Sequence, residues 1–318
     1  MNNQTPRASK PTRFADLRYD SAFKIVFGNP NNKGPMLGVI NTLIPGLNIV
    51  DFEFDDKEIP GYFIGDRKTV FDLMCHTEDR KQTFVIEMQF AGQKYFGDRA
   101  LFYSTYPIRE QLISIDEEYR WRTDHIKPKR RDYSLSPVYM ISILNFDLPH
   151  EADNTEDSKF LRDGLVSSYS LRGDLGGCRD LMTDALHFVF LELTRFSVPF
   201  ENPEWCKTTL EQIAYIFCYA SKLEDIPESF KDNFIQQLLH SAEIANFTAE
   251  QRRNYDTEMT TEIDKLAQLD YQYDKGHDAG KVEGKIEIVK KMLAKDMAIE
   301  LICELTGLSK EDVLALRQ

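Results

Sequence analysis

The chain has 318 residues, of which 42% are hydrophobic and 29% are charged, a composition typical of a globular protein with a sizeable core. No apolar run approaches the length of about 18 residues that a membrane-spanning helix needs, and the polar N-terminal residues do not match a secretory signal. We therefore expect a cytoplasmic protein without a membrane span. Five scattered cysteines without a Cys-x-x-Cys pair argue against a zinc cluster.

The acidic charge is confined to one part of the chain. The net charge is −13, but residues 1–150 contain 20 Lys or Arg and 20 Asp or Glu, so the whole excess lies in the other 168 residues. Within the neutral part, six cations lie between Tyr119 and Tyr133, with Trp121 and His125 among them. This mixture suits phosphate contact with base stacking, and it equally suits a solvated loop.

Two helices and a strand are predicted first along the chain. Residues 20–27 place apolar side chains at helical spacing, and Asn29-Pro30 ends that helix. A second helix is predicted over residues 33–43. Residues 49–54 alternate between polar and apolar side chains, which predicts an edge-like strand entering a sheet.

The most informative stretch is a predicted β-hairpin with arms at residues 69–75 and 82–89. Both arms are rich in β-branched and aromatic residues, and a charged, turn-prone tip at residues 78–81 separates them. If the arms pair around the midpoint of this tip, Asp72 falls directly opposite Glu87. The same register predicts two further pairs on that face, Val70 with Gln89 and Met74 with Val85.

The two facing carboxylates are the main chemical signal of the hairpin. Directly opposed side chains have Cβ atoms about 4.5–5.5 Å apart, so Asp72 and Glu87 repel each other unless a cation lies between them. Because Mg²⁺ prefers oxygen ligands, the pair predicts a divalent metal site, and a structural salt-bridge site is the alternative. The apolar opposite face favours a hairpin covered on both sides, where an acid is seldom buried without a partner.

After the hairpin, a long helix is predicted over residues 94–113, which Pro107 could bend. The almost wholly apolar residues 138–146 predict a strand buried on both faces. Residues 150–157 are acidic and loop-like. The remaining predicted elements are strands at 166–171 and 186–193, of which the second could equally be helical, and amphipathic helices at 210–222 and 230–245.

The C-terminal region is rich in charge and in helix-forming residues. Gly276, Gly280 and Gly284 recur every fourth residue, which would let another helix approach closely. We prefer to interpret them as a flexible hinge, because each glycine costs a helix about 1 kcal/mol. Beyond them an apolar stripe ends at Gly307, and Ser309 begins a short helix, which together predict an appendage for protein contacts such as self-association. The stripe consists of Ile299, Ile302 and Leu305, and the residues predicted to face inward on the short helix are Val313, Leu314 and Leu316.

Asp72, followed fifteen positions later by Glu87-Met88-Gln89, resembles the core of the PD-(D/E)XK nuclease superfamily in its E-x-Q form. The wider context resembles the PD-(D/E)XK transposase-like group, which is related to the recombination-promoting nucleases. Further likeness lies in four stretches that together span nearly the whole chain, namely residues 19–28, residues 99–103 leading to Gln111-Leu112, residues 136–144 and residues 292–316.

The resemblance implies an α/β fold with a restriction-endonuclease-like core, whose mixed central sheet is flanked by helices, and a helical C-terminal extension. We place the core at residues 14–200, a helical part packed on it at 201–258, and the extension with its helix-turn-helix-like appendage at 259–318. The resemblance also implies cleavage of DNA with Mg²⁺ or Mn²⁺ as the cofactor.

The resemblance assigns roles to five residues of this sequence. Asp72 and Glu87 would be the carboxylate ligands of the metal, with the Met88 carbonyl oxygen as a third ligand. Gln89 takes the place of a lysine that orients the attacking water, and a neutral amide can hold a water but supplies no positive charge. Asp20 matches an acidic residue of the first core helix that ligates the metal directly or through water.

Substrate contacts are implied for Arg99, Lys24 and Gln111. Arg99 would contact the scissile phosphate, and a surface salt bridge is its alternative. For Asp20 the alternative is an i,i+4 ion pair with Lys24. We interpret His76, near the hairpin tip, as non-catalytic.

Two other functions remain open. The missing lysine and the acidic second half favour a non-catalytic module that binds DNA or protein with the same fold. The other is an assembly protein that forms homo-oligomers through its glycine stripe and C-terminal helices.

Overall fold

The computed structural model describes residues 12–55, 58–59, 69–79, 81–123, 134–149, 164–173 and 180–316. The chain forms two compact units, Met1–Tyr255 and Asp256–Gln318. The side chains of the cation cluster between Tyr119 and Tyr133 lie outside the described residues, as does the acidic segment 150–157. In the part of the chain that is described, no helix has the length and apolar character to span a membrane.

The first unit is built on a mixed six-stranded sheet. Its order is β1-β4-β5-β6-β8-β7, in which β5, β6 and β8 run parallel and the other neighbours pair antiparallel. The central strand β6 is buried along its whole length, as its apolar sequence predicts. The segment whose type was ambiguous, β8, is a strand because it pairs with β6 along seven residues. The strands are β1 (Glu53–Phe54), β4 (Leu73–His76), β5 (Thr83–Gln89), β6 (Val138–Leu144), β7 (Val166–Ser170) and β8 (Leu186–Glu192).

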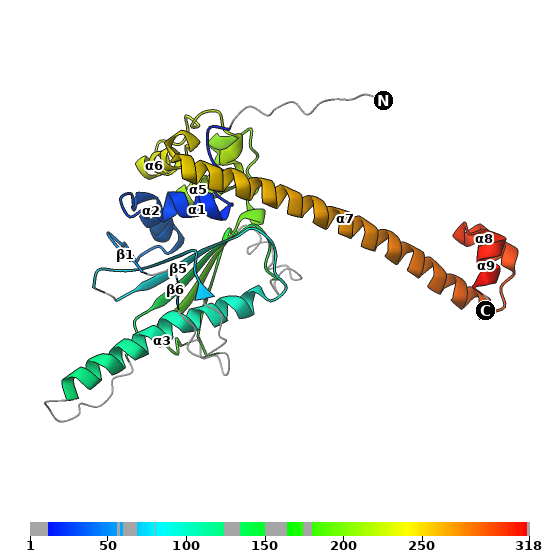
Figure 1. Cartoon of the computed structure of the whole chain (residues 1–318), viewed down its shortest axis with the longest axis horizontal. Coiled ribbons are helices and arrows are strands. Elements are labelled where there is room, and N and C mark those ends of the chain that lie inside the picture. The colour runs from blue at the N-terminus through cyan, green and yellow to red at the C-terminus, as the bar shows by residue number, and fades with distance from the viewer. Residues whose placement is uncertain are drawn as a thin grey trace. The chain divides into compact units, whose positions relative to one another are not determined.

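One face of the sheet is covered by the long helix α3 (Phe96–Thr123), which Figure 1 shows below the strands. Tyr103 and Tyr106 of α3 pack on a cluster of buried side chains from the sheet, namely Phe71, Met74, Val85 and Met140. The helix runs ten residues beyond its predicted end and contains Pro107.

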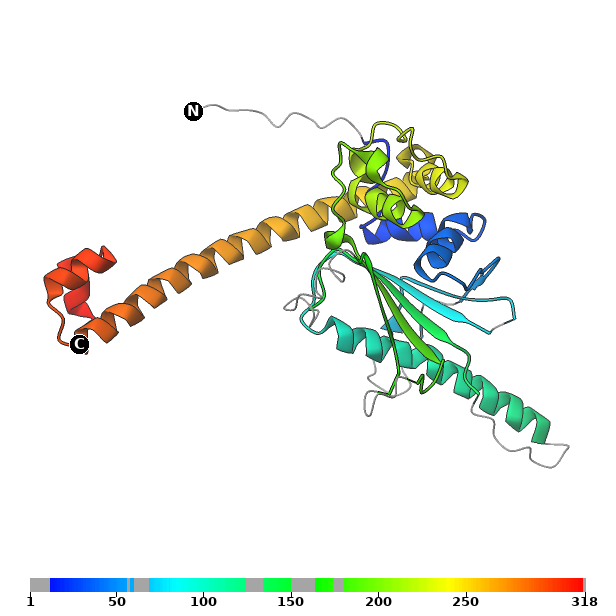
Figure 2. The ribbon, with the colours of Figure 1, turned by 180° about the vertical axis from the view of Figure 1, so that it is seen from behind.

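Four helices cover the other face, as Figures 1 and 2 show from opposite sides. Phe27 of the first helix stacks on Phe217, with ring centroids 5.8 Å apart. Gly38 lies against Phe234, where a Cβ atom would come within 2.1 Å of the ring, so two of these helices touch closely only because this position is glycine. The helices are α1 (Asp20–Phe27), α2 (Gly34–Leu43), α5 (Thr209–Tyr219) and α6 (Asn233–Ser241). Short 3-10 turns, η2 (Leu193–Arg195), η3 (Pro203–Trp205), η4 (Ala220–Lys222) and η5 (Ile244–Asn246), join the elements that follow the sheet.

A separate two-stranded sheet corrects one predicted pairing. Strand β3 (Thr69–Val70) pairs with β2 (Glu58–Ile59), with Val70 opposite Glu58. The predicted pairing of Val70 with Gln89 is therefore wrong, because the first hairpin arm bends at Phe71-Asp72 and leaves β5.

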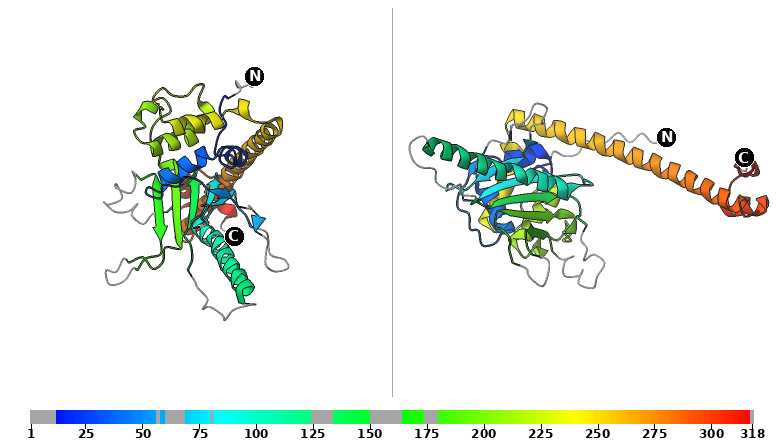
Figure 3. Two further views of the ribbon diagram at one scale, coloured as in Figure 1. Left: turned by 90° about the vertical axis from the view of Figure 1, so that its left-hand side faces the viewer. Right: turned by 90° about the horizontal axis from the view of Figure 1, so that it is seen from below.

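The C-terminal helices are α7 (Ala249–Leu293), α8 (Ile299–Thr306) and α9 (Lys310–Ala315), which Figure 3 shows in two further views. Helix α7 continues through all three glycines of the stripe, so our preference for a hinge there is wrong. Gly307 ends α8 in the left-handed conformation with φ +70°, and the Ser309 side chain caps α9, as predicted. Ile302 and Val313 pack on Val289, the end of α7. The predicted inward position of Leu314 is wrong, since its side chain is exposed, and Leu305 of the apolar stripe is exposed as well.

Candidate functional site

Asp72 and Glu87 come together where β4 begins beside β5. Leu73 pairs with Ile86 and Met74 with Val85, which is the register predicted from the hairpin tip. Continued by one residue, this register brings Asp72 beside Glu87. Asp72 itself lies in the bend that precedes β4, and its Oδ2 accepts a hydrogen bond of 3.0 Å from the Met88 N–H.

Both carboxyl groups are held in surroundings that disfavour their charge. Glu87 is only 4% exposed, and burial, reinforced by the negative charge of Asp72, raises its pKa to about 7. Burial also raises the pKa of Asp72, against the opposing effects of Lys24 and the Met88 N–H. The two acids are therefore close enough to influence each other's ionisation, and neither is fully compensated by the protein.

Lys24 links the pair to Asp20 from the α1 side of the sheet. Its Nζ lies 2.7 Å from Asp20 Oδ1 and 3.3 Å from Asp72 Oδ1. Burial acts to lower the pKa of Lys24, but the hydrogen bond to Asp20 and the charge of Asp72 outweigh it, so the pKa is raised. The i,i+4 ion pair that the sequence offered as an alternative for Asp20 is thus present, and the same lysine reaches Asp72.

Arg99 approaches from the opposite side, because α3 lies on the other face of the sheet from α1 (Figure 1). Gln89 Nε2 donates to Glu87 Oε2 at 3.2 Å, and Gln89 Oε1 accepts from Gln93 Nε2 at 3.2 Å and from Arg99 Nη1 at 3.4 Å. Arg99 Nη1 also donates to Gln93 Oε1 at 2.6 Å. This network connects the guanidinium group of Arg99 to the carboxylate of Glu87 through two amides.

Sequence reasoning missed Gln93, which lies just before α3 and completes this network. It also missed Ser142, which pairs with Glu87 across β5 and β6 and is 1% exposed. The Ser142 hydroxyl has no hydrogen-bond partner among the described residues. A hydroxyl within the otherwise apolar run of β6 was the available signal, because a buried polar group ordinarily has a partner.

Gln111 lies away from these residues. Its side-chain amide donates to the Ser136 carbonyl at 3.1 Å and accepts from the Ser136 N–H at 2.8 Å, so it ties α3 to the segment before β6. Gln111 therefore has a role within the fold, and its implied substrate contact stays a prediction. His76, which we interpreted as non-catalytic, lies at the β1 edge with its Nδ1 2.9 Å from Asp55 Oδ1.

The oxygen atoms at this site are of the kind that a hard divalent cation binds. Because the N–H and C=O of a strand residue point toward the same neighbour, the Met88 carbonyl lies on the Asp72 side of β5. Two carboxylates with raised pKa values and this carbonyl form an oxygen donor set that fits a divalent ion. Within the described ranges, however, no three His, Cys, Asp or Glu side chains gather closely enough to hold a metal by themselves.

Comparison with known proteins found one family. The model of the PD-(D/E)XK nuclease family transposases matches residues 17–272, which include the helix α1, the whole sheet and all the side chains described above. No curated protein and no solved structure matches the chain.

Proposed function

The chain belongs to the PD-(D/E)XK nuclease family transposases, and we propose on that premise that it is a metal-dependent endonuclease that hydrolyses phosphodiester bonds in DNA. The observation that carries the proposal is the pair of acids, Glu87, which is buried, and Asp72, which is partly buried, whose pKa values are both raised. Nucleases of this kind typically use divalent metals, and such a pair is costly to bury unless it serves a cation.

The metal would be Mg²⁺ or Mn²⁺, held by the carboxylates of Asp72 and Glu87 and by the Met88 carbonyl oxygen. When bound, a divalent ion neutralises charge on the phosphoryl oxygens and lowers the pKa of a bound water. Binding would require Glu87 to ionise, because a protonated carboxyl is a poor ligand. With a pKa of about 7, Glu87 loses its proton near neutral pH, so metal affinity should rise through that range.

The surrounding side chains would have separate tasks. Lys24 holds Asp20 and Asp72 in place and lessens their repulsion. Arg99, held by Gln89 and Gln93, would contact the scissile phosphate with its remaining N–H groups. Asp20, which is half-exposed, would bind the metal through a water on the outer side of the site.

Nicking of supercoiled plasmid with Mg²⁺ tests the proposal. Asp72→Asn and Glu87→Gln keep the shape of each side chain and remove its charge, and each should lower the rate by about a hundredfold or more. Glu228→Gln, the same change at an exposed glutamate, is the matched control and should nick at the wild-type rate. Wild-type rates in both active-site variants would refute the assignment.

A catalytically weak or inactive module that binds DNA or protein is the second candidate, and one contact favours it. Gln89 Oε1 already accepts two hydrogen bonds, so this oxygen has little capacity left for holding a water. Calorimetry with Mg²⁺ or Mn²⁺ separates the two, since an inactive site should bind the ion weakly or not at all. Self-association through the C-terminal helices is tested by light scattering with and without residues 259–318.

A further inference from the structure

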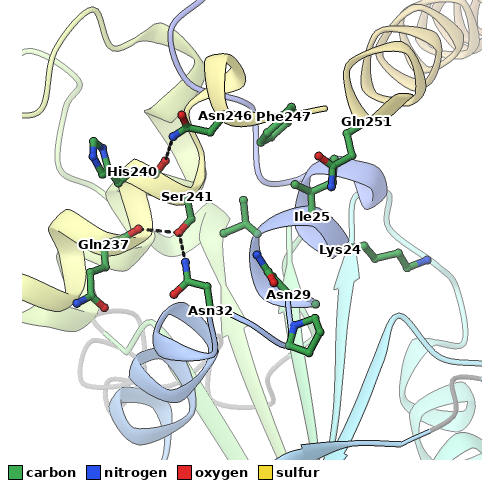
Figure 4. Close-up of a pocket in the computed structure, with 13 residues that line it drawn as sticks. Lys24, Ile25, Asn29, Asn32, Gln237, His240, Ser241, Asn246, Phe247 and Gln251 are labelled. Atoms are coloured by element: carbon green, nitrogen blue, oxygen red, sulfur yellow. Dashed lines mark hydrogen bonds between the residues drawn. The ribbon is translucent and has the colours of Figure 1, made fainter. Parts of the chain in front are cut away.

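A hollow of about 620 Å³ lies beside α1 and shares one lining residue, Lys24, with the proposed active site. Its walls come from α1 and the loop after it, from α6, from η5 and from the start of α7, as Figure 4 shows. The volume lies within the range of about 300–1,000 Å³ that is usual for small-molecule sites. Lys24 lines one side of the hollow, and its Nζ is the atom that lies 3.3 Å from Asp72.

The lining of the hollow differs in charge from the rest of the chain. Asp and Glu make up 52 of 318 residues, so 13 residues taken at random would include about two, yet none of the 13 lining residues is acidic. Carboxylates do lie next to two of the lining side chains, Glu243 beside His240 and both Asp20 and Asp72 beside Lys24. The lining residues themselves add no negative charge.

Hydrogen bonds fix how Asn32 faces the hollow. The Ser241 hydroxyl donates its one hydrogen to the Gln237 carbonyl at 2.8 Å. It must therefore accept, and not donate, in its 2.9 Å bond with Asn32 Nδ2. The Asn32 amide is thus held with Oδ1 as an acceptor and with the second Nδ2 hydrogen as a donor.

Two further amides are oriented in the same way. Asn246 Nδ2 donates to the His240 carbonyl at 2.9 Å, which leaves Asn246 Oδ1 as an acceptor and the second Nδ2 hydrogen as a donor. Asn29 Oδ1 accepts from the Asn31 N–H at 3.0 Å, which leaves Asn29 Nδ2 as a donor. Within the part of the chain that is described, these remaining atoms make no other hydrogen bond. Figure 4 shows the three side chains around one space.

A mixture of fixed donors and acceptors selects the class of ligand. A phosphate only accepts hydrogen bonds, so it could pair with the N–H groups of these amides but not with the oxygens of Asn32 and Asn246. The edge of a nucleobase presents donors and acceptors side by side, and asparagine amides pair well with it. Ile25, Pro30 and Phe247 add apolar surface for a planar ring.

We propose that this hollow binds an unpaired base of the DNA. The proposal rests on the proposed function and adds to it a preference for DNA in which a base is bulged out or extruded from the stack. Lys24, shared by the hollow and the carboxylates, would place that base next to the site of cleavage.

Fluorescence anisotropy with two duplexes tests the proposal. One duplex carries a single bulged adenine and the other an abasic residue at the same position, and Ca²⁺ replaces Mg²⁺ in the buffer. Wild type should bind the first about tenfold more tightly, the equivalent of one or two hydrogen bonds. Asn29→Asp keeps the oxygen that accepts from Asn31 but replaces the donor with an anionic oxygen, so it should abolish the preference.

Asn31→Asp is the matched control, because it adds the same charge two residues away at a side chain that does not line the hollow. It should keep the tenfold preference. The proposal would be overturned if wild type bound the two duplexes equally, or if Asn29→Asp and Asn31→Asp changed the preference to the same extent. Neither result would contradict the proposed nicking of plasmid DNA. Failure to bind either duplex would instead refute DNA as the substrate, and this inference with it.

Discussion

The cost of ionising Glu87 can be measured directly. The raised pKa means that the folded protein holds the proton of Glu87 more tightly than the unfolded chain does, in which the pKa is near 4.5. Each pH unit of this difference is worth about 1.4 kcal/mol, so above pH 7 the ionised side chain destabilises the fold by about 3 kcal/mol. The stability is complete below about pH 4.5 and is lost as the pH rises through about 7.

Glu87→Gln should remove this cost, because glutamine has the same shape and no charge and can still accept from Gln89 Nε2. In chelator, urea unfolding at pH 8 should show the variant to be more stable than wild type by about 3 kcal/mol, and at pH 5 by less than about 1 kcal/mol. The exposed control Glu228→Gln should stay within about 0.5 kcal/mol at both pH values. An equal gain at pH 5 and pH 8 would show that charge is not the cause.

Two other variants probe the neighbours of the site. Gln111→Ala should lower the free energy of unfolding by about 1–2 kcal/mol, because its two hydrogen bonds to Ser136 are lost. The nicking rate of the folded variant should be unchanged. A tenfold fall in that rate would instead indicate that Gln111 contacts the substrate. Lys24→Met removes the cation that lies 3.3 Å from Asp72 and should raise the pKa of Asp72 further. NMR titration of the carboxyl groups measures this pKa. An unchanged pKa would contradict the geometry described for Lys24.

Local patterns were sufficient to predict much of the fold. The helix over residues 20–27 and the buried strand β6 follow from spacing and composition alone. The register of the hairpin followed from the position of its tip, because strand side chains alternate with a period of two. The helix caps at Gly307 and Ser309 could also be predicted, since each depends only on residues within a few positions.

Other features depended on partners far away in the sequence. The bend at Asp72 arises because Thr69–Val70 pairs with Glu58–Ile59 and not with the end of β5. The continuity of α7 through three glycines was likewise not evident, since helix propensity is a weak guide for a helix of 45 residues.

The sequence by itself determined which residues are candidates for the chemistry, since Asp72, Glu87 and Gln89 are marked by type and spacing within one hairpin. Only the tertiary structure decided how they are charged and what they contact. Burial raises the pKa of Glu87, and from helices on opposite faces of the sheet Lys24 reaches Asp72 and Arg99 reaches Gln89. Ionisation depends on every charge and dipole within several ångströms, and those neighbours are brought together only when the sheet and its two layers of helices close around them.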